Sequence, residues 1–206
     1  ASLRGLPLSW AFREQAQRMP PISRRLLLED AAPSTVDPSM LLDELMLPVE
    51  ARAAAQIGVD SADPILQRQA VLPPEVCARL RDAVDAERQQ KHDSVDGAPD
   101  HQLNLSRERL DDLIGATAAA ALWRLPGDFS AAHVEGGLSV ADARIFVRRY
   151  SPAERPWNPF HTDSAALTIN VALSASGDGG ELLACYNGGM RRLLRREGEA
   201  TVHSST

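Results

Sequence analysis

Aromatic residues, cysteines and long apolar runs are all scarce in this sequence. Only 4% of its 206 residues are aromatic while 44% are hydrophobic, so aliphatic side chains must fill the core. Two distant cysteines, Cys77 and Cys185, do not make a disulfide framework, and each is expected to be a free thiol. No apolar run has membrane-spanning length, and no charged-then-apolar leader opens the chain. The composition therefore predicts a soluble globular protein without membrane partners. It does not indicate the cellular compartment.

A surplus of basic residues is also lacking. The formal net charge is −6, whereas a protein that binds nucleic acid by neutralising phosphates usually carries excess positive charge. The one basic cluster is Arg191, Arg192, Arg195 and Arg196. We interpret it as the solvated side of a strand pair rather than a phosphate-binding patch, and expect no nucleic-acid partner.

Prolines divide the chain into two parts. They interrupt every apolar stretch of residues 1–66, which we interpret as an irregular, partly helical N-terminal extension. Short helices are expected near residues 10–18 and 38–47, with a third over 49–57. Residues 67–206 form the expected globular domain.

The first half of this domain has helical periodicity. A short strand is expected at residues 70–72, followed by a helix from Pro74 to about Gln89. Residues 90–104 are polar and turn-rich, so His92 and His101 within them are expected to be solvated. A second helix is expected over 107–122, with Ser106 as its N-cap and Pro126-Gly127 as its end.

The second half alternates with a period of two. Strands are expected at residues 143–150, 166–173, 181–186, 190–196 and 200–204. Helices followed by a run of short strands are typical of α+β proteins in which helices pack on an antiparallel sheet. Strands of this length and spacing suit a barrel or jelly roll.

The tripeptide His161-Thr162-Asp163 is the strongest chemical motif. Residues two apart on an extended segment lie on the same face, so the imidazole and the carboxylate can converge on one metal ion. A His, a carboxylate and a more distant His form the facial triad of non-haem iron(II) oxygenases, which leaves positions open for co-substrate and oxygen. The alternative for the tripeptide alone is a surface loop that holds a hydrogen-bonded His-Asp pair.

Residues around this motif resemble a known family. Arg149-Tyr150, a proline-rich loop, Phe160-His161-Thr162-Asp163, the alternating segment 167–173 and Gly179-Gly180-Glu181-Leu182 follow one another. This order is similar to the catalytic core of the prolyl 4-hydroxylase-like 2-oxoglutarate/Fe(II) oxygenases. The resemblance extends over residues 70–206.

The resemblance implies a double-stranded β-helix, or jelly roll, with flanking helices. It implies Fe(II) as metal, 2-oxoglutarate as co-substrate and ascorbate as a candidate reductant. It also implies oxidative decarboxylation of 2-oxoglutarate to succinate and carbon dioxide, coupled to hydroxylation of a C–H bond in a prolyl or other peptidyl residue or in a small molecule. The oligomeric state is left open.

Four further residues have roles only through this resemblance. Tyr150, Thr168 and Asn170 are candidate co-substrate contacts, although each is also an ordinary strand residue. The family's third iron ligand is a His on a later strand. Here it is either His203 or a residue after Thr206, so we expect the oxygenase domain, residues 67–206, to be incomplete at its C-terminus. Asn158 stands where many prolyl 4-hydroxylases have a tyrosine, which puts one co-substrate contact in doubt.

Two other kinds of protein remain compatible with the sequence. One is a non-catalytic interaction or scaffold module that retains an oxygenase-like fold. The other is an unrelated jelly roll of the cupin type, although cupins supply several His ligands from neighbouring strands.

Overall fold

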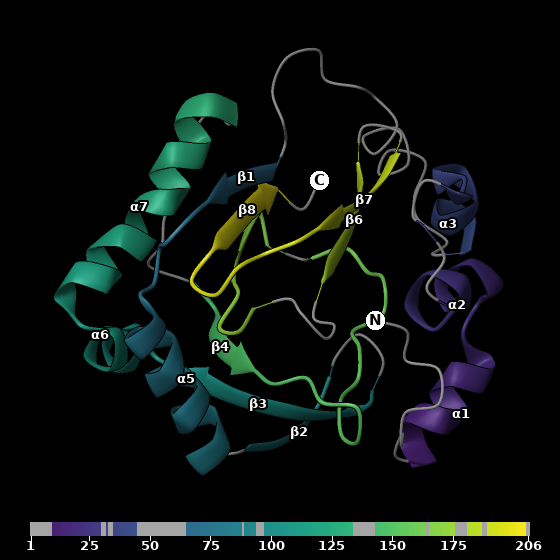
Figure 1. Cartoon of the computed structure of the whole chain (residues 1–206), viewed down its shortest axis with the longest axis horizontal. Coiled ribbons are helices and arrows are strands. Elements are labelled where there is room, and N and C mark those ends of the chain that lie inside the picture. Colours follow the sequence, from purple (N-terminus) through teal and green to yellow (C-terminus); the bar gives the residue numbers. More distant parts are fainter. Residues whose placement is uncertain are drawn as a thin grey trace.

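Helices lie at two opposite sides of a set of antiparallel strands (Figure 1). The computed structural model describes residues 10–29, 32, 35–44, 65–87, 89–93, 97–133, 143–163, 165–175, 181–186 and 189–204. On one side are α5 (Pro74–Ala86), α6 (Arg107–Ile114) and α7 (Ala116–His133). On the other are α1 (Trp10–Arg18), α2 (Pro21–Leu27) and α3 (Pro38–Glu44).

The described strands form three antiparallel sheets. In the first, β8 (Ala200–Ser204) lies between β1 (Ile65–Arg68) and β5 (Leu167–Val171). In the second, β3 (Pro99–Leu105) lies between β2 (Gln89–His92) and β4 (Ile145–Arg148). The third is a hairpin of β6 (Leu182–Tyr186) and β7 (Gly189–Leu193). Mixed helices and antiparallel sheets are therefore present, while the jelly roll stays a prediction.

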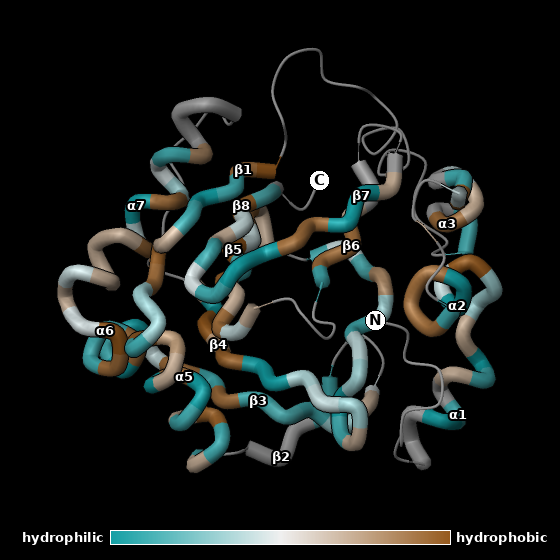
Figure 2. The backbone as a smooth tube through the Cα atoms, in the orientation of Figure 1, coloured by the Kyte–Doolittle hydropathy of each residue, from teal (hydrophilic) through white to brown (hydrophobic). Residues whose placement is uncertain are grey.

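The main core lies between α5, α6, α7 and the first two sheets. Figure 2 shows apolar residues gathered where these helices approach β4 and β8. Fully buried members include Cys77 of α5 and Val202 of β8, with 0% of each residue exposed. The apolar residues of β5 pack against this core, whereas Thr168 and Asn170 alternate with them. The period-two pattern therefore places the polar residues of β5 together on its other face.

A close backbone contact joins the segment just before α5 to the turn before β8. Gly198 has a φ of +79°, and its carbonyl accepts hydrogen bonds from the amides of Val71 and Leu72 at 2.9 and 3.2 Å. A Cβ at this position would lie 2.0 Å from the carbonyl oxygen of Leu72. Glycine is therefore required here both by conformation and by space.

Several expected boundaries are wrong. The strand expected at 70–72 lies earlier, at Ile65–Arg68, where it pairs with β8. The segment read as a polar linker forms β2 and β3, because polar residues of β3 are buried by partners distant in sequence. Gly115, with a φ of +81°, divides the expected helix 107–122 into α6 and α7.

Pro126 does not end the second helix, which continues to His133. Proline removes one hydrogen bond from a helix, but Leu125 and Phe129 on either side are buried in the core and hold the helix in place. The cap expected at Ser106 is confirmed, since its hydroxyl accepts a hydrogen bond from the Arg109 amide at 3.1 Å.

In the N-terminal part, α1 and α3 confirm two expected helices, and α2 was not expected. The helix expected over 49–57 lies outside the described residues. Within the described ranges, every helix is too short or too polar to cross a membrane.

Candidate metal centre

His161 and Asp163 face each other on the loop that follows β4. The distance from His161 Nε2 to Asp163 Oδ1 is 3.1 Å, and 29% and 30% of the two side chains are exposed. Two cis ligands that each lie ~2.1 Å from an octahedral ion are roughly 3 Å apart. The spacing of these two atoms therefore fits joint coordination of one ion as well as it fits a direct ion pair.

The other ring nitrogen of His161 is already engaged. Nδ1 lies 2.8 Å from the carbonyl oxygen of Pro159, which can only accept, so Nδ1 donates. In a neutral imidazole with this tautomer, Nε2 carries a lone pair. A lone pair that faces a carboxylate oxygen at 3.1 Å requires a cation between them, which is either a proton on Nε2 or a metal ion.

Asp163 is oriented through its second oxygen. The hydroxyl of Thr168 on β5 donates to Oδ2 at 2.5 Å, which leaves Oδ1 directed at His161. Metal-binding carboxylates and imidazoles are commonly held by such outer hydrogen bonds. Thr168 is thus brought to the pair, and its contact is with the carboxylate.

His161 and Asp163 shift each other's pKa in opposite directions. The hydrogen bond with His161 lowers the pKa of Asp163 to about 2, and the Thr168 hydroxyl contributes in the same direction. The hydrogen bond with Asp163 raises the pKa of His161, and the charge of the buried Asp93 adds to this rise. Charge on His203 also lowers the pKa of Asp163, so β8 contributes to the same electrostatic environment.

Asn170 and His203 form a neighbouring polar pair. Thr168 of β5 is the register partner of His203 on β8, and Asn170 Nδ2 lies 3.4 Å from His203 Nε2. Asn170 and Thr168 are two residues apart on the strand and share one face. The strand register therefore gathers these three side chains on the face that carries Asp163.

Tyr150 is placed differently. It is 44% exposed and forms a hydrogen bond with Arg148, whose pKa it helps to raise. Among the described residues, no hydrogen bond or ion pair joins Tyr150 to His161 or Asp163. Its connection to them is indirect, because Arg148 pairs with Asp93, which influences His161.

A buried network of charged side chains contacts the loop that carries His161 and Asp163. Arg155, with 0% of its surface exposed, contacts Asp93 and Asp100 at 3.4 Å each and donates to Asn158 Oδ1 at 2.7 Å. Arg148 reaches the same two carboxylates at 2.6 and 3.0 Å. Burial raises the pKa of Asp100 despite the two guanidinium groups. Asn158 thus links the loop to the buried Arg155.

Sequence reasoning missed this network because its members come from β3, β4 and two loops. The expectation that His101 is solvated is wrong: it is 5% exposed, and its Nδ1 lies 2.8 Å from Glu154 Oε2. The only local signal was the strand-length segment 99–105, in which polar residues outnumber the apolar ones. The expectation for His92, by contrast, is confirmed, since it is exposed.

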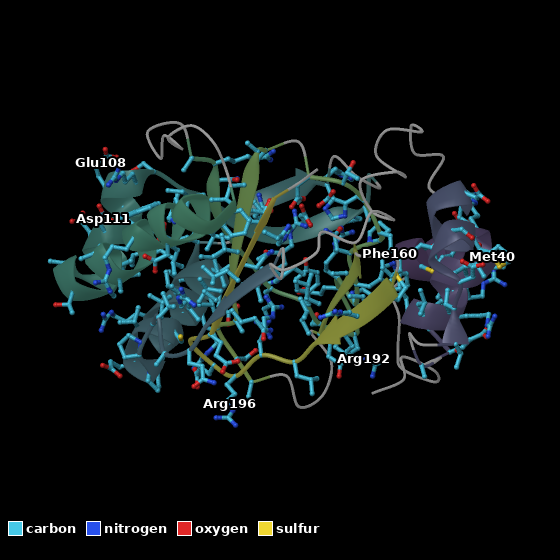
Figure 3. The ribbon with its side chains drawn as sticks, turned by 90° about the horizontal axis from the view of Figure 1, so that it is seen from above. Met40, Glu108, Asp111, Phe160, Arg192 and Arg196 are labelled. Carbon is cyan, nitrogen blue, oxygen red and sulfur yellow. The ribbon has the colours of Figure 1, made fainter. Side chains whose placement is uncertain are left out.

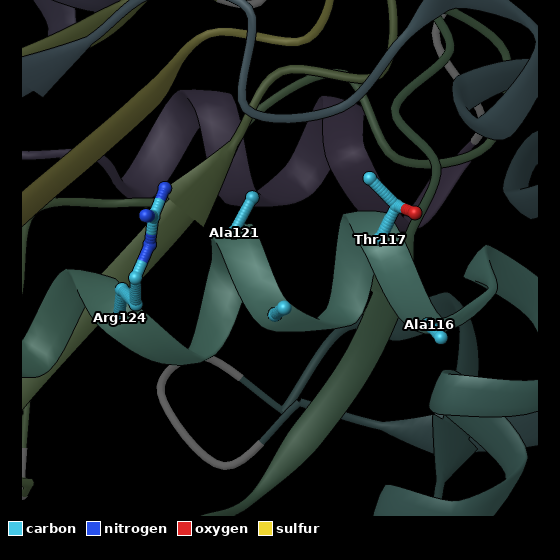
Figure 4. Close-up of a pocket in the computed structure, with 5 residues that line it drawn as sticks. Ala116, Thr117, Ala121 and Arg124 are labelled. Carbon is cyan, nitrogen blue, oxygen red and sulfur yellow. The ribbon is translucent and has the colours of Figure 1, made fainter.

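Other parts of the described chain offer less chemistry. Within the described ranges, no three His, Cys, Asp or Glu side chains come together in an arrangement that could hold a metal ion. A shallow hollow of about 530 Å³ lies on one face of α7 (Figure 4). It is lined by Ala116, Thr117, Ala120, Ala121 and Arg124. This lining has one charged side chain and no general acid or base for catalysis.

Comparisons of the chain with family models, with curated proteins and with solved structures find no match.

The pair should titrate as a unit in the metal-free protein. Because the pKa of His161 is raised above 6.5, its stabilising contribution is complete below that pH and is lost as the pH rises through the raised value. Because the pKa of Asp163 falls from 3.8 to about 2, its contribution is complete above 3.8 and is lost as the pH falls toward 2. We expect an NMR titration of the His161 ring to give a midpoint above 6.5 and Asp163→Asn to lower it. A wild-type midpoint at or below 6.5 would contradict the direct pairing.

Proposed function

We propose that this chain is a 2-oxoglutarate- and Fe(II)-dependent dioxygenase that hydroxylates a C–H bond, with His161 and Asp163 as two of the iron ligands. One observation carries the proposal. His161 Nε2 and Asp163 Oδ1 face each other at 3.1 Å, while Nδ1 is held by a carbonyl and Oδ2 by a hydroxyl. In each side chain one atom, Nδ1 or Oδ2, is held by a hydrogen bond. The other atom, Nε2 or Oδ1, is directed toward the position that a cation would take.

The donor set suits iron(II). An imidazole and a carboxylate are two of the three groups in the facial triad of non-haem iron oxygenases. When bound, the metal with 2-oxoglutarate and dioxygen supplies the oxidising chemistry: one oxygen atom enters succinate, carbon dioxide leaves, and the other oxygen becomes the product hydroxyl. The protein contributes position and charge. Asp163 favours a divalent cation, and Pro159 keeps the Nε2 lone pair of His161 available.

Neighbouring side chains have distinct tasks in this proposal. Thr168 orients the Asp163 carboxylate, which leaves Asn170 as the stronger candidate for a direct co-substrate contact on β5. His203 lies beside Asn170 and would complete the polar wall of the site. Tyr150 remains a candidate contact only through Arg148, since it is 44% exposed and has no direct bond to the pair among the described residues. The substrate is proposed to be a prolyl or other peptidyl residue or a small molecule.

A turnover assay tests this function directly. We expect the protein loaded with Fe(II) to consume 2-oxoglutarate in air and to form succinate and carbon dioxide in equal amounts, and Asp163→Ala to abolish both. Asp112→Ala, which removes an exposed carboxylate from α6, is the matched control and should retain turnover. If iron is bound at the pair and no succinate forms with peptide or small-molecule substrates, the enzymatic proposal fails.

A second candidate is a non-catalytic binding module with an oxygenase-like fold. The observation that favours it is that the described residues supply two close metal donors and not three. Such a module would bind a divalent ion weakly and would leave 2-oxoglutarate unchanged. The same assay separates the two candidates.

A further inference from the structure

We infer that the three N-terminal helices α1, α2 and α3, here called the anchor layer, position the loop that carries His161 and Asp163. The expected effect on metal affinity rests on the proposed function. The structural content of the inference is independent of the metal. Residues 156–163 lie in neither a helix nor a strand, so side-chain packing must set their geometry.

One contact of the anchor layer involves the residue next to His161 in the sequence. Phe160, the residue before His161, packs against a cluster made by side chains of α2, α3, β7 and the segment just before α3. The buried members of that cluster are Ile22, Leu26, Val36, Leu41 and Met190. Figure 3 shows Phe160 between the strands and the N-terminal helices, of which α3 carries Met40, with Glu108 and Asp111 of α6 at the opposite end of the molecule.

A second contact lies four residues before His161. Trp157 is 4% exposed and forms a separate cluster with Met19, at the end of α1, and with Ala98. Leu27 and Leu28 at the end of α2 pack against the same cluster. Since Asn158 and Pro159 lie between the two aromatic anchors, the anchor layer also fixes the carbonyl that holds His161 Nδ1.

Hydrogen bonds join the anchor layer into one unit. The Glu44 carboxylate at the end of α3 accepts from the amides of Ile22 and Ser23 at 2.6 and 3.0 Å, so it satisfies the first turn of α2. Arg24 of α2 donates to the carbonyls of Gln17 and Met19 at 2.7 and 3.2 Å, at the end of α1. A disturbance in any of these helices should therefore reach both aromatic anchors.

The expected consequence is lower metal affinity without any change to a ligand. Groups that only orient metal ligands typically change affinity by about 10–100-fold when they are removed. Leu26→Ala and Leu41→Ala each open the cluster beneath Phe160, where 3% and 0% of the two residues are exposed. We expect each to weaken binding of Co(II), an air-stable probe, by about tenfold. Leu41→Met, which refills most of the volume, should recover wild-type affinity.

The matched control is Leu110→Ala on α6, where the leucine is 5% exposed in the main core. It makes the same truncation away from the anchor layer and should lower the unfolding midpoint without changing Co(II) affinity. A second readout is hydrogen exchange of the amides from Trp157 to Asp163 in the metal-free protein. Exchange there should be faster in Leu26→Ala and Leu41→Ala than in Leu110→Ala.

The two readouts separate failure of the inference from failure of the proposed function. If the wild type binds no Co(II), the metal proposal fails, while faster exchange from Trp157 to Asp163 still supports the anchor layer. If affinity and exchange are unchanged in both anchor-layer variants, or if Leu110→Ala alters them equally, the inference is overturned. Should either truncation prevent folding, Glu44→Gln is the milder variant and is judged by the same two measurements.

Discussion

Replacing either His161 or Asp163 with alanine is expected to weaken Fe(II) or Co(II) binding by roughly 100-fold or more, because each variant loses a direct ligand. Loss of an outer hydrogen bond alone costs up to about 100-fold. The two proposed ligand atoms, His161 Nε2 and Asp163 Oδ1, lie 3.1 Å apart, and each variant removes one of them. Isothermal titration under anaerobic conditions measures the affinity for Fe(II), and absorption of bound Co(II) gives an independent value.

Three further variants serve as controls for this result. His92→Ala removes an exposed histidine, whose Nδ1 lies 2.9 Å from the Gly97 carbonyl oxygen, and should leave affinity unchanged. Thr168→Val removes the hydroxyl from Asp163 Oδ2 and should cost about tenfold, with Thr168→Ser recovering the loss. Equal metal affinity in His161→Ala and in the wild type would place the ion elsewhere.

Arg155→Ala is expected to lower the free energy of unfolding by about 3–5 kcal/mol, because removing one partner of a buried ion pair leaves charge uncompensated. Arg155 is fully buried and contacts two carboxylates, Asp93 and Asp100, of which 3% of each side chain is exposed. Arg148 alone would then face both acids. Urea unfolding followed by circular dichroism gives the free energy.

The control for this variant is Arg149→Ala. Arg149 pairs with Asp85 at 2.7 Å, but 48% and 47% of the two side chains are exposed, so water replaces the interaction. Such a pair contributes less than ~1 kcal/mol. Adding Asp100→Asn to Arg155→Ala removes one of the stranded charges and should restore part of the stability. Similar losses in Arg155→Ala and Arg149→Ala would show that the network contributes no more than a surface pair.

Local patterns predicted the elements whose signals are contained within a few residues. Pro74 at the first turn of α5, Ser106 as the cap of α6 and the alternation along β5 all involve neighbours in sequence. Predictions that were wrong depend on partners far away. The polar strand β3 is stable because Gln102 pairs with Arg148, 46 residues later.

The same distinction between nearby and distant partners applies to the candidate site. His161 and Asp163 are two residues apart and Thr168 follows within five, so a short motif was sufficient to bring them together. The supports of the loop could not be predicted from such a motif. Arg155 reaches Asp93 and Asp100 across more than 50 residues, and the anchor layer reaches Phe160 from the N-terminal part of the chain. The sequence thus predicted that His161 and Asp163 would meet, and not what holds them in position.

Iron-edge anomalous diffraction from crystals grown with Fe(II) under anaerobic conditions tests the metal assignment most directly. We expect one anomalous peak within bonding distance of both His161 Nε2 and Asp163 Oδ1, with Nδ1 still bonded to the Pro159 carbonyl and Thr168 still bonded to Oδ2. An iron peak elsewhere, or no peak while the two side chains remain directly paired at 3.1 Å, would contradict the assignment.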